Sequence, residues 1–428
     1  MTKQKQSHIL PIIMMIALFG MISFVTGLQN PMGIIVKNQF GATNFMSQLG
    51  NLANFIAYLF MGIPSGLLLQ KVGYKKTALI AVAVGFVGVG IQYLSGGMGS
   101  FGVYLTGAFV SGFSMCMLNA VVNPMLNTLG GGGKKGNQLI QIGGSFNSLN
   151  ATIVPVLVGY LIGNASQASI KDASPALFIA MGIFALVFVV LLAVNIPEPR
   201  LAIQQKEAGK KDPHSPLSFR HFIFGAIAIF VYVGIEVGIP NFSNLYMTSS
   251  IAEGGLAMDT TIAGSVVGTY WFLMLIGRLT GGIVGGKISS RVMLGFTATI
   301  AGLFVVLAIF SSPETTVNMP VFFSDISFGT AQVPIGIMFL TLCGLCTSVM
   351  WGGIFNLAVE GLGKYTEAAS GIFMMLVCGG GILPAVQGLL ADGVSFMASF
   401  WLVFAGAIYL LFYALVGYKN VNTNIPVE

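Results

Sequence analysis

The sequence predicts an all-α membrane protein with twelve transmembrane helices in two six-helix halves. Three observations lead to this fold class: a scarcity of charge, a regular series of apolar runs, and basic residues that gather on one side of the predicted membrane. Of 428 residues, 55% are hydrophobic and 7% are charged, whereas a soluble domain carries roughly 25% charged residues. Most of the surface must therefore face lipid, which excludes a soluble enzyme.

Apolar runs recur along the whole chain, and each is about the 20 residues that cross roughly 30 Å of hydrocarbon. The runs of the first half are 9–36, 45–70, 76–95, 102–129, 137–163 and 174–195. Those of the second half are 219–248, 260–286, 291–311, 332–358, 366–391 and 396–418. The polar stretch between them predicts an N-terminal half (1–195), a cytoplasmic linker (196–218) and a C-terminal half (219–428).

The basic residues predict the orientation of these runs. If both termini are cytoplasmic, all but two of the 19 Lys and Arg residues fall in cytoplasmic segments, the two exceptions being Lys37 and Lys171. This asymmetry is typical of a multi-pass protein of the bacterial inner membrane. The net charge of +6 then reflects topology, and because the charges form no continuous face, we expect no nucleic-acid partner.

No set of residues in the sequence indicates catalysis or a cofactor. Cys343 and Cys346 form a C-x-x-C within an apolar run that has no His nearby, so a buried helical pair is expected rather than a metal or redox site. The glycine-rich loop 130–135 lacks the Gly-Lys-Ser/Thr ending and the preceding strand of a phosphate-binding loop. We therefore expect no cofactor, no metal and no enzymatic activity.

Polar side chains inside the runs predict a cavity between the helices. In 137–163, Gln141, Ser145 and Ser148 share one helical face, with Asn147 beside it. In 102–129, three asparagines are spaced i, i+4 and i+8 around Pro124, which leaves the carbonyl of Ala120 without its helical partner. Amides and hydroxyls both donate and accept hydrogen bonds, so they suit a neutral, polyhydroxylated ligand. The alternative is that these amides join helices to one another.

Glu236 is the one acidic residue well inside a run, and a charge there costs roughly 3 kcal/mol on insertion scales. A residue kept at that cost could carry a proton, ligate a cation or bind a substrate hydroxyl. The alternative is a structural hydrogen bond to a backbone group freed near Pro240. Basic residues near the cytoplasmic ends of helices are expected to act in gating, and these are Lys71, Lys75, Arg278, Lys287 and Arg291.

Five stretches together resemble a known family over nearly the whole chain. They are Leu118–Pro124, Ser145–Ser148, Tyr232–Val237, Gly277–Gly281 and the run from Gly353 to Ile382. In this order they are similar to the fucose–galactose–glucose branch of the major facilitator superfamily, the L-fucose:proton symporter group. The resemblance implies the major facilitator fold and a sugar permease that works by alternating access.

The resemblance also implies roles for individual residues. Asn30 and Asn147 match amides that contact sugar in the family, and Trp351 falls where a family aromatic packs on the sugar ring. Glu236 matches an acidic residue of the glucose/galactose members. Two family carboxylates linked to proton coupling are replaced here by Asn119 and Gly33. Coupling would then fall to Glu236, to a sodium ion held by neutral oxygens, or to no cation at all.

The resulting hypothesis is a monosaccharide importer in which Glu236 couples transport to a proton or sodium ion. A single protomer is expected to be the functional unit. The residues predicted to bind substrate are Asn30, Gln48, Asn51, Asn119, Asn123, Gln141, Asn147, Tyr232, Asn241, Trp351, Asn356 and Gln387. The alternatives are an uncoupled sugar facilitator, a transporter of another neutral solute, or a membrane receptor that binds sugar without moving it. An intramembrane enzyme is disfavoured because no catalytic set is present.

Overall fold

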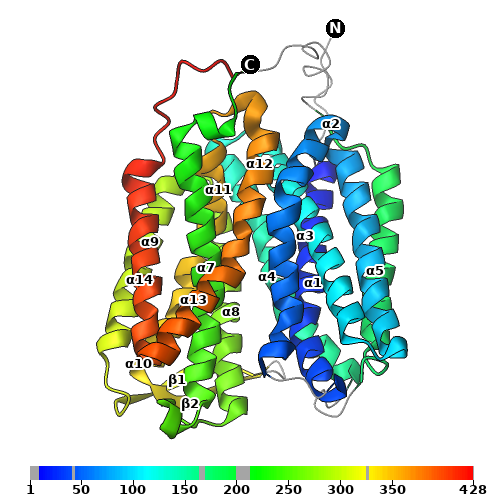
Figure 1. The fold of residues 1–428 in the computed structure, drawn as a ribbon. Helices are drawn as coiled ribbons and strands as arrows, with labels where there is room; N and C mark the ends of the chain where they lie inside the picture. Colours follow the sequence, from blue (N-terminus) through cyan, green and yellow to red (C-terminus); the bar gives the residue numbers. More distant parts are fainter. Residues whose placement is uncertain (1–8, 41–43, 163–168, 199–212, 324–326, 428) are drawn as a thin grey trace.

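The computed structural model describes residues 9–40, 44–162, 169–198, 213–323 and 327–427. Its helices run side by side in two groups, with the first half in blue to green and the second half in green to red (Figure 1). The C-terminus and the start of the second half lie at one end of the bundle, called here the tail end. A β-hairpin lies at the other end, called here the hairpin end (Figure 1).

The helices of the first half follow the predicted runs with one difference. They are α1 (Ile9–Phe40), α2 (Asn44–Met98), α3 (Phe101–Leu129), α4 (Gly133–Ile162) and α5 (Ser174–Ala193). Helix α2 contains two predicted runs, 45–70 and 76–95, which meet at Gly73 in a non-helical conformation (φ 84°, ψ 179°). Glycine tolerates this positive φ without steric cost, so the chain reverses there.

The second half has more breaks than the sequence predicts. Its helices are α7 (Arg220–Thr248), α8 (Thr260–Val284), α9 (Ser290–Phe310), α10 (Ile335–Thr347), α11 (Met350–Val359), α12 (Thr366–Met375), α13 (Gly379–Gly393) and α14 (Phe396–Phe412). The predicted runs 332–358 and 366–391 are therefore each divided into two helices. Short helical turns are η1 (Pro216–Ser218), η2 (Ile251–Glu253), η3 (Gly363–Tyr365), η4 (Leu376–Cys378) and η5 (Tyr413–Gly417).

A β-hairpin between α9 and α10 was not predicted. Strand β1 (Thr316–Phe322) pairs antiparallel with β2 (Phe328–Pro334), with Thr316 opposite Pro334 and Phe322 opposite Phe328. The predicted start of the run 332–358 is therefore wrong, because residues 332–334 belong to β2 and the helix begins at Ile335.

The structure agrees with the predicted membrane class. Within the described residues, ten segments are long and apolar enough to cross a membrane, and one of them, Leu49–Met98, holds two predicted runs. Helix α4 is not among the ten, and several of its side chains lie outside the described residues. The all-α class is confirmed, and the count of twelve crossings stays a prediction.

Two prolines inside helices leave carbonyls that hydroxyl groups of other helices satisfy. Pro124 of α3 frees the carbonyl of Ala120, as the sequence predicts, and Ser370 Oγ of α12 donates to it at 3.1 Å. Pro240 of α7 frees the carbonyl of Glu236, and Tyr270 Oη of α8 donates to it at 3.2 Å. The carbonyl freed near Pro240 thus has a tyrosine partner and does not require the Glu236 carboxylate.

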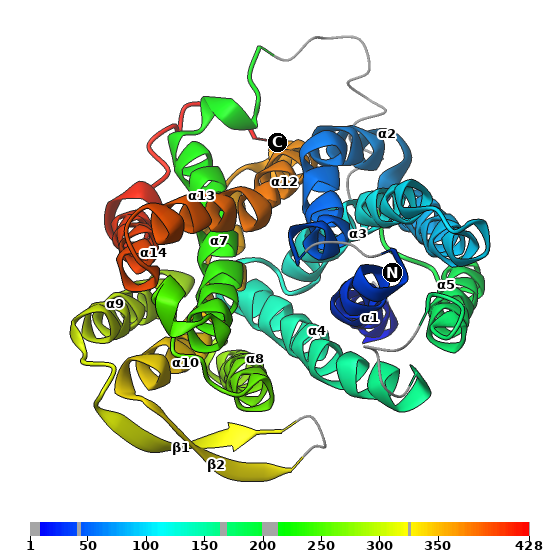
Figure 2. The same cartoon turned by 60° about the horizontal axis from the view of Figure 1, so that its bottom comes forward.

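The two halves meet chiefly along two pairs of helices, α4 with α8 and α2 with α12 (Figure 2). At the tail end, Lys134 Nζ of α4 donates to the Lys287 carbonyl at 2.9 Å. Along α2 and α12, a Cβ built on Gly371 would lie 2.7 Å from both the Gly62 carbonyl oxygen and the Gly66 Cα. Backbones this close require glycine on both helices.

Candidate functional site

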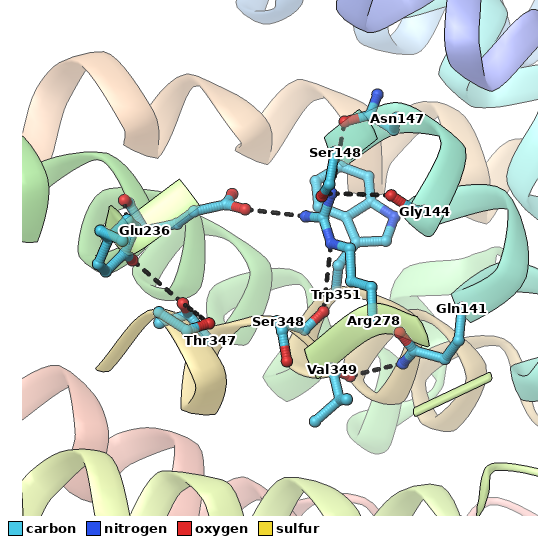
Figure 3. A network of polar contacts seen from close by, with 12 residues as sticks. Gln141, Gly144, Asn147, Ser148, Glu236, Arg278, Thr347, Ser348, Val349 and Trp351 are labelled. Atoms are coloured by element: carbon cyan, nitrogen blue, oxygen red, sulfur yellow. Dashed lines mark hydrogen bonds and ion pairs between the residues drawn. The ribbon is translucent and has the colours of Figure 1, made fainter. Parts of the chain in front are cut away.

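An ion pair lies inside the second half. Arg278 Nη2 of α8 is 3.0 Å from Glu236 Oε1 of α7, and the two side chains are 10% and 13% exposed (Figure 3). Breaking such a pair by removing one partner typically costs 3–5 kcal/mol, since a charge is left uncompensated. Glu236 therefore has a specific partner that the sequence analysis did not assign to it.

Arg278 also bonds to the first half. Its Nη1 donates to Ser148 Oγ at 2.8 Å, to the Gly144 carbonyl at 3.2 Å and to Asn147 Oδ1 at 3.4 Å, all on α4 (Figure 3). Its Nε donates to the Ser348 carbonyl, between α10 and α11, at 3.3 Å. One guanidinium thus joins the Glu236 carboxylate to both halves of the protein.

This arrangement changes the expected place of Arg278. The sequence analysis put it with the gating residues near the end of its helix, whereas the structure brings it to Glu236. The sequence could have indicated this contact through charge pairing, because an acidic residue inside a membrane span needs a partner. Arg278 lies six residues inside the end of α8 at Val284, deeper than the other basic residues of that region.

A second set of contacts centres on Trp351, at the start of α11. Its indole Nε1 donates to Asn123 Oδ1 of α3 at 2.9 Å, so this bond also crosses between the halves. The ring packs edge-on against Tyr232 and Phe373, with centroid distances of 6.3 and 6.2 Å. Because Tyr232 is one helical turn before Glu236, the aromatic cluster lies beside the ion pair.

Several predicted amides already hold helices together. Asn119 Nδ2 donates to Tyr58 Oη at 3.0 Å, and Asn123 Nδ2 donates to the Asn119 carbonyl at 2.8 Å. Gln141 Nε2 donates to the Val349 carbonyl of the other half at 2.8 Å. Asn147 Nδ2 donates to the Phe19 carbonyl of α1 at 3.2 Å. The amides of α3 and α4 therefore surround the ion pair and Trp351 and also stabilise the helix contacts.

Of the remaining predicted substrate residues whose side chains the structure describes, none bonds to Glu236, Arg278 or Trp351. Asn241 is exposed, and Asn51 is half-buried on α2. Asn356 Nδ2 donates to Ser290 Oγ at 3.0 Å between α11 and α9, and Gln387 Nε2 donates to Ser399 Oγ at 3.4 Å between α13 and α14. The side chains of Asn30 and Gln48 lie outside the described residues.

The other predicted gating residues lie at the tail end. Lys71 is exposed, and Lys75 Nζ donates to the Leu192 carbonyl at 2.9 Å. The Lys287 carbonyl accepts from Lys134, and the Arg291 guanidinium lies 5.0 Å from the Tyr418 ring centroid.

A carboxylate holds the turn inside α2, which lies at the tail end of the bundle. Glu198 accepts the backbone N–H groups of Tyr74 and Lys75, both at 2.8 Å, just after Gly73. Burial raises the pKa of Glu198 above its usual value, and these two donors oppose that rise.

Other chemistry has little support in the described part of the chain. No group of three or more His, Cys, Asp or Glu residues there could hold a metal ion. Cys116, Cys343, Cys346 and Cys378 are free and buried. The candidate site therefore rests on the ion pair and the Trp351 cluster.

Comparisons with known proteins identify the family. The model of the Major Facilitator Superfamily matches residues 13–384. A glucose/galactose transporter of Brucella abortus is 28% identical over 411 residues, which cover 94% of this chain and 93% of that protein. The L-fucose-proton symporter of Escherichia coli is 23% identical over 412 residues, which cover 91% of this chain and 88% of that protein.

A solved structure agrees with this result. The crystal structure of the Major Facilitator Superfamily transporter FucP in the outward conformation has a TM-score of 0.80 and 20% identity to this chain. The match covers 97% of this chain and 100% of that one, so the two folds agree. The family resemblance found in the sequence is confirmed: the chain belongs to the Major Facilitator Superfamily and is a transporter rather than an enzyme.

Proposed function

We propose that this transporter imports a monosaccharide of the fucose or hexose kind across the bacterial inner membrane, driven by a co-transported proton or sodium ion. The observation that carries the proposal is the Arg278–Glu236 ion pair, because Arg278 also bonds to α4 of the other half. The charge on one carboxylate thereby influences the contact between the halves. The names of the relatives, glucose/galactose transporter and L-fucose-proton symporter, support the substrate class and the coupling.

The residues beside the ion pair suit a sugar. A pyranose ring presents hydroxyls at its rim and C–H groups on its faces, so it fits an aromatic face next to amides. Trp351 is half-buried and bonds to Asn123, and Asn147 lies next to Arg278. We assign the ring face to Trp351 and hydroxyl contacts to Asn123 and Asn147. On binding, the hydroxyls would take over bonds that these amides now make to protein groups.

Alternating access would require the contacts of the tail end to break. The bonds from Lys134 to Lys287, from Gln141 to Val349 and from Ser370 to Ala120 all join one half to the other. An importer with a cytoplasmic tail end would take up sugar from the hairpin end in this state. Rocking of the halves would then open the tail end.

Cation binding at Glu236 would change the same contacts. A proton on the carboxylate removes the charge that pairs with Arg278, and a sodium ion there would compete with the guanidinium for it. In either case Arg278 gains freedom to move with respect to Ser148 and Asn147 on α4. We propose that a single protomer embedded in the lipid bilayer, with both termini cytoplasmic, carries out this cycle without a nucleic-acid partner.

Uptake into proteoliposomes tests the proposal. Labelled fucose, glucose, galactose and mannose would be offered with a proton gradient, a sodium gradient or neither, to the unaltered protein and to Glu236→Gln. We expect one gradient to drive accumulation of at least one sugar, and Glu236→Gln to abolish accumulation because it removes the titratable charge. Glu314→Gln, which alters an exposed carboxylate in the loop before β1, is the matched control and should accumulate sugar normally.

The alternatives give different outcomes in the same assay. Equal equilibration under every gradient, unchanged in Glu236→Gln, would indicate an uncoupled facilitator. The absence of uptake for all four sugars would contradict the substrate class and favour another neutral solute. Counterflow of labelled sugar separates transport from a receptor, which would show binding without exchange.

The hydrogen bond from Ser370 to Ala120 gives a smaller, independent prediction. Ser370→Ala leaves the carbonyl freed by Pro124 without its donor from the other half. The net contribution of a hydrogen bond to stability is about 1 kcal/mol, so loss of this bond should raise the population with an open tail end about fivefold. Distance measurements between spin labels at the tail ends of the two halves would detect the shift. Ser23→Ala is the control, since that hydroxyl donates to Gly20 of its own helix, and an equal shift in both variants would contradict the prediction.

A further inference from the structure

Tyr270 of α8 is a buried tyrosine that holds the backbone of Glu236. Its hydroxyl donates to the Glu236 carbonyl at 3.2 Å, and it lies 3.1 Å from Thr347 Oγ1 at the end of α10. The Tyr270 side chain is 1% exposed. Two side chains of α8 therefore hold Glu236, since Arg278 pairs with its carboxylate and Tyr270 bonds to its backbone.

The hydroxyl groups of Tyr270 and Thr347 form a directed chain of hydrogen bonds. Pro240 has no N–H for the Glu236 carbonyl, and a buried carbonyl is almost always paired, so the Tyr270 proton is needed there. A hydroxyl has one proton, and Thr347 must therefore be the donor to Tyr270. Thr347 Oγ1 also lies 3.1 Å from the Cys343 carbonyl, which is inside the hydrogen-bond ladder of α10. The chain thus runs from Thr347 through Tyr270 to the backbone of Glu236.

A short segment between α10 and α11 connects these contacts to the candidate sugar residue. This junction segment, Thr347–Trp351, joins the end of α10 to the start of α11. Its Ser348 carbonyl accepts from Arg278 Nε at 3.3 Å, so the segment is bonded to both α8 side chains that hold Glu236. Figure 3 shows residues of the segment in a row beside the ion pair. Trp351, which we assign to the ring face of the sugar, is its last residue.

Helices α8 and α10 pack so closely that the junction segment must follow α8. A Cβ built on Gly344 of α10 would overlap the Tyr270 carbonyl oxygen, and one built on Gly277 of α8 would overlap Ser348 Oγ. Approaches this close depend on glycine, because any larger residue would separate the two helices. A displacement of the α8 side chains that hold Glu236 is therefore also a displacement of the junction segment.

Helix α7 can bend beside Glu236. Pro240 removes one bond of the helical ladder, and helices kink or bend where the ladder is interrupted. Without another bond at this point, bending of α7 would absorb a change at the Glu236 carboxylate. The Tyr270 hydroxyl replaces the missing bond with one to α8, and it thereby ties the Glu236 backbone to the junction segment.

We propose that Tyr270 is a positioning residue that makes cation binding at Glu236 and sugar binding at Trp351 depend on each other. The inference rests on the proposed function of those two residues. A proton or sodium ion at Glu236 weakens its bond to Arg278. Because Tyr270 holds the Glu236 backbone, the change is transmitted to the junction segment and so to Trp351. Coupling between two sites is reciprocal, so bound sugar raises the cation affinity by the same factor.

Equilibrium binding of sugar to the full-length protein in lipid nanodiscs tests the proposal. Affinities for labelled fucose, glucose, galactose and mannose are measured at acidic and alkaline pH, and with and without sodium chloride. For at least one sugar, the coupling cation should raise the affinity of the unaltered protein at least about fivefold. In Tyr270→Phe, which lacks the hydroxyl and keeps the ring, the cation should raise the affinity less than about twofold, while sugar still binds.

Tyr409→Phe is the matched control. Tyr409 Oη of α14 donates to the Phe224 carbonyl of α7 at 3.0 Å, so this variant also removes a bond from a tyrosine to the α7 backbone. It should lose a similar amount of thermal stability and keep the cation effect on sugar affinity. An equal loss of the cation effect in Tyr270→Phe and Tyr409→Phe would overturn a specific role for Tyr270.

Two variants of Thr347 test the chain of hydrogen bonds. Valine has the shape of threonine without the hydroxyl, so Thr347→Val should reduce the cation effect on sugar affinity. Thr347→Ser keeps a hydroxyl and should preserve the effect, and equal effects in the two variants would contradict the chain. A full cation effect in Tyr270→Phe would overturn this inference and leave the proposed function in place. The absence of any cation effect in the unaltered protein would overturn both.

Discussion

Replacing Arg278 by glutamine is expected to lower sugar transport at least about 100-fold. The variant leaves the Glu236 carboxylate buried without its partner, and it removes the donor to Ser148 and Gly144 of the other half. Loss of one partner of a buried pair costs 3–5 kcal/mol, and each 1.36 kcal/mol corresponds to about a tenfold change. The measurement is the initial rate of uptake in proteoliposomes that contain equal amounts of folded protein.

A double variant separates the two roles of the pair. In Arg278→Gln with Glu236→Gln, neither charge remains, so the cost of an unpaired carboxylate disappears. Protein yield and thermal stability should recover, whereas accumulation driven by a cation gradient should stay absent. Recovery of accumulation in the double variant would contradict a coupling role for Glu236. Normal transport by the single Arg278→Gln variant would contradict the importance of the pair itself.

The fold was largely predictable because the bilayer limits the choices. A span must be apolar, about 20 residues long and helical, so composition and length locate most helices. The connection between the runs 45–70 and 76–95 was predicted, and the helix breaks there at Gly73. The hairpin from Thr316 to Pro334 was not foreseen, because hydropathy gives no clear signal for two short strands.

The candidate site was predictable only in part. Glu236 is conspicuous because a charge inside a span is costly, and the periodicity of α4 identifies the face that carries Gln141 and Ser148. Periodicity identifies a face but not the group opposite it. The bond from Gln141 to Val349 joins residues 208 positions apart, and the bonds from Arg278 to α4 also cross between the halves. Such partners depend on how the two halves pack, which no local pattern contains.

The contact between α2 and α12 should be the most sensitive to an added side chain. In Gly371→Val, the new Cβ would meet the Gly62 carbonyl oxygen and the Gly66 Cα, both at 2.7 Å. These neighbours are backbone atoms, so no change of rotamer relieves the overlap, and the helices must separate. Overpacking usually costs 1–3 kcal/mol, which predicts a 5- to 150-fold shift toward the state with an open tail end.

The shift toward the open tail end can be measured with a cysteine placed where α4 contacts the end of α8. Gln138 of α4 lies against Gly286, where a built Cβ would be 2.8 Å from its Oε1. Gln138→Cys should react with a maleimide from the tail end at least fivefold faster when combined with Gly371→Val. Gly264→Val is the control, because a Cβ there meets no atom within 4 Å and should leave the rate unchanged. If each half rocks as one body, separation of α2 from α12 must also loosen α4 from α8. An unchanged rate in Gly371→Val would therefore mean that the halves do not close through the glycine contact between α2 and α12.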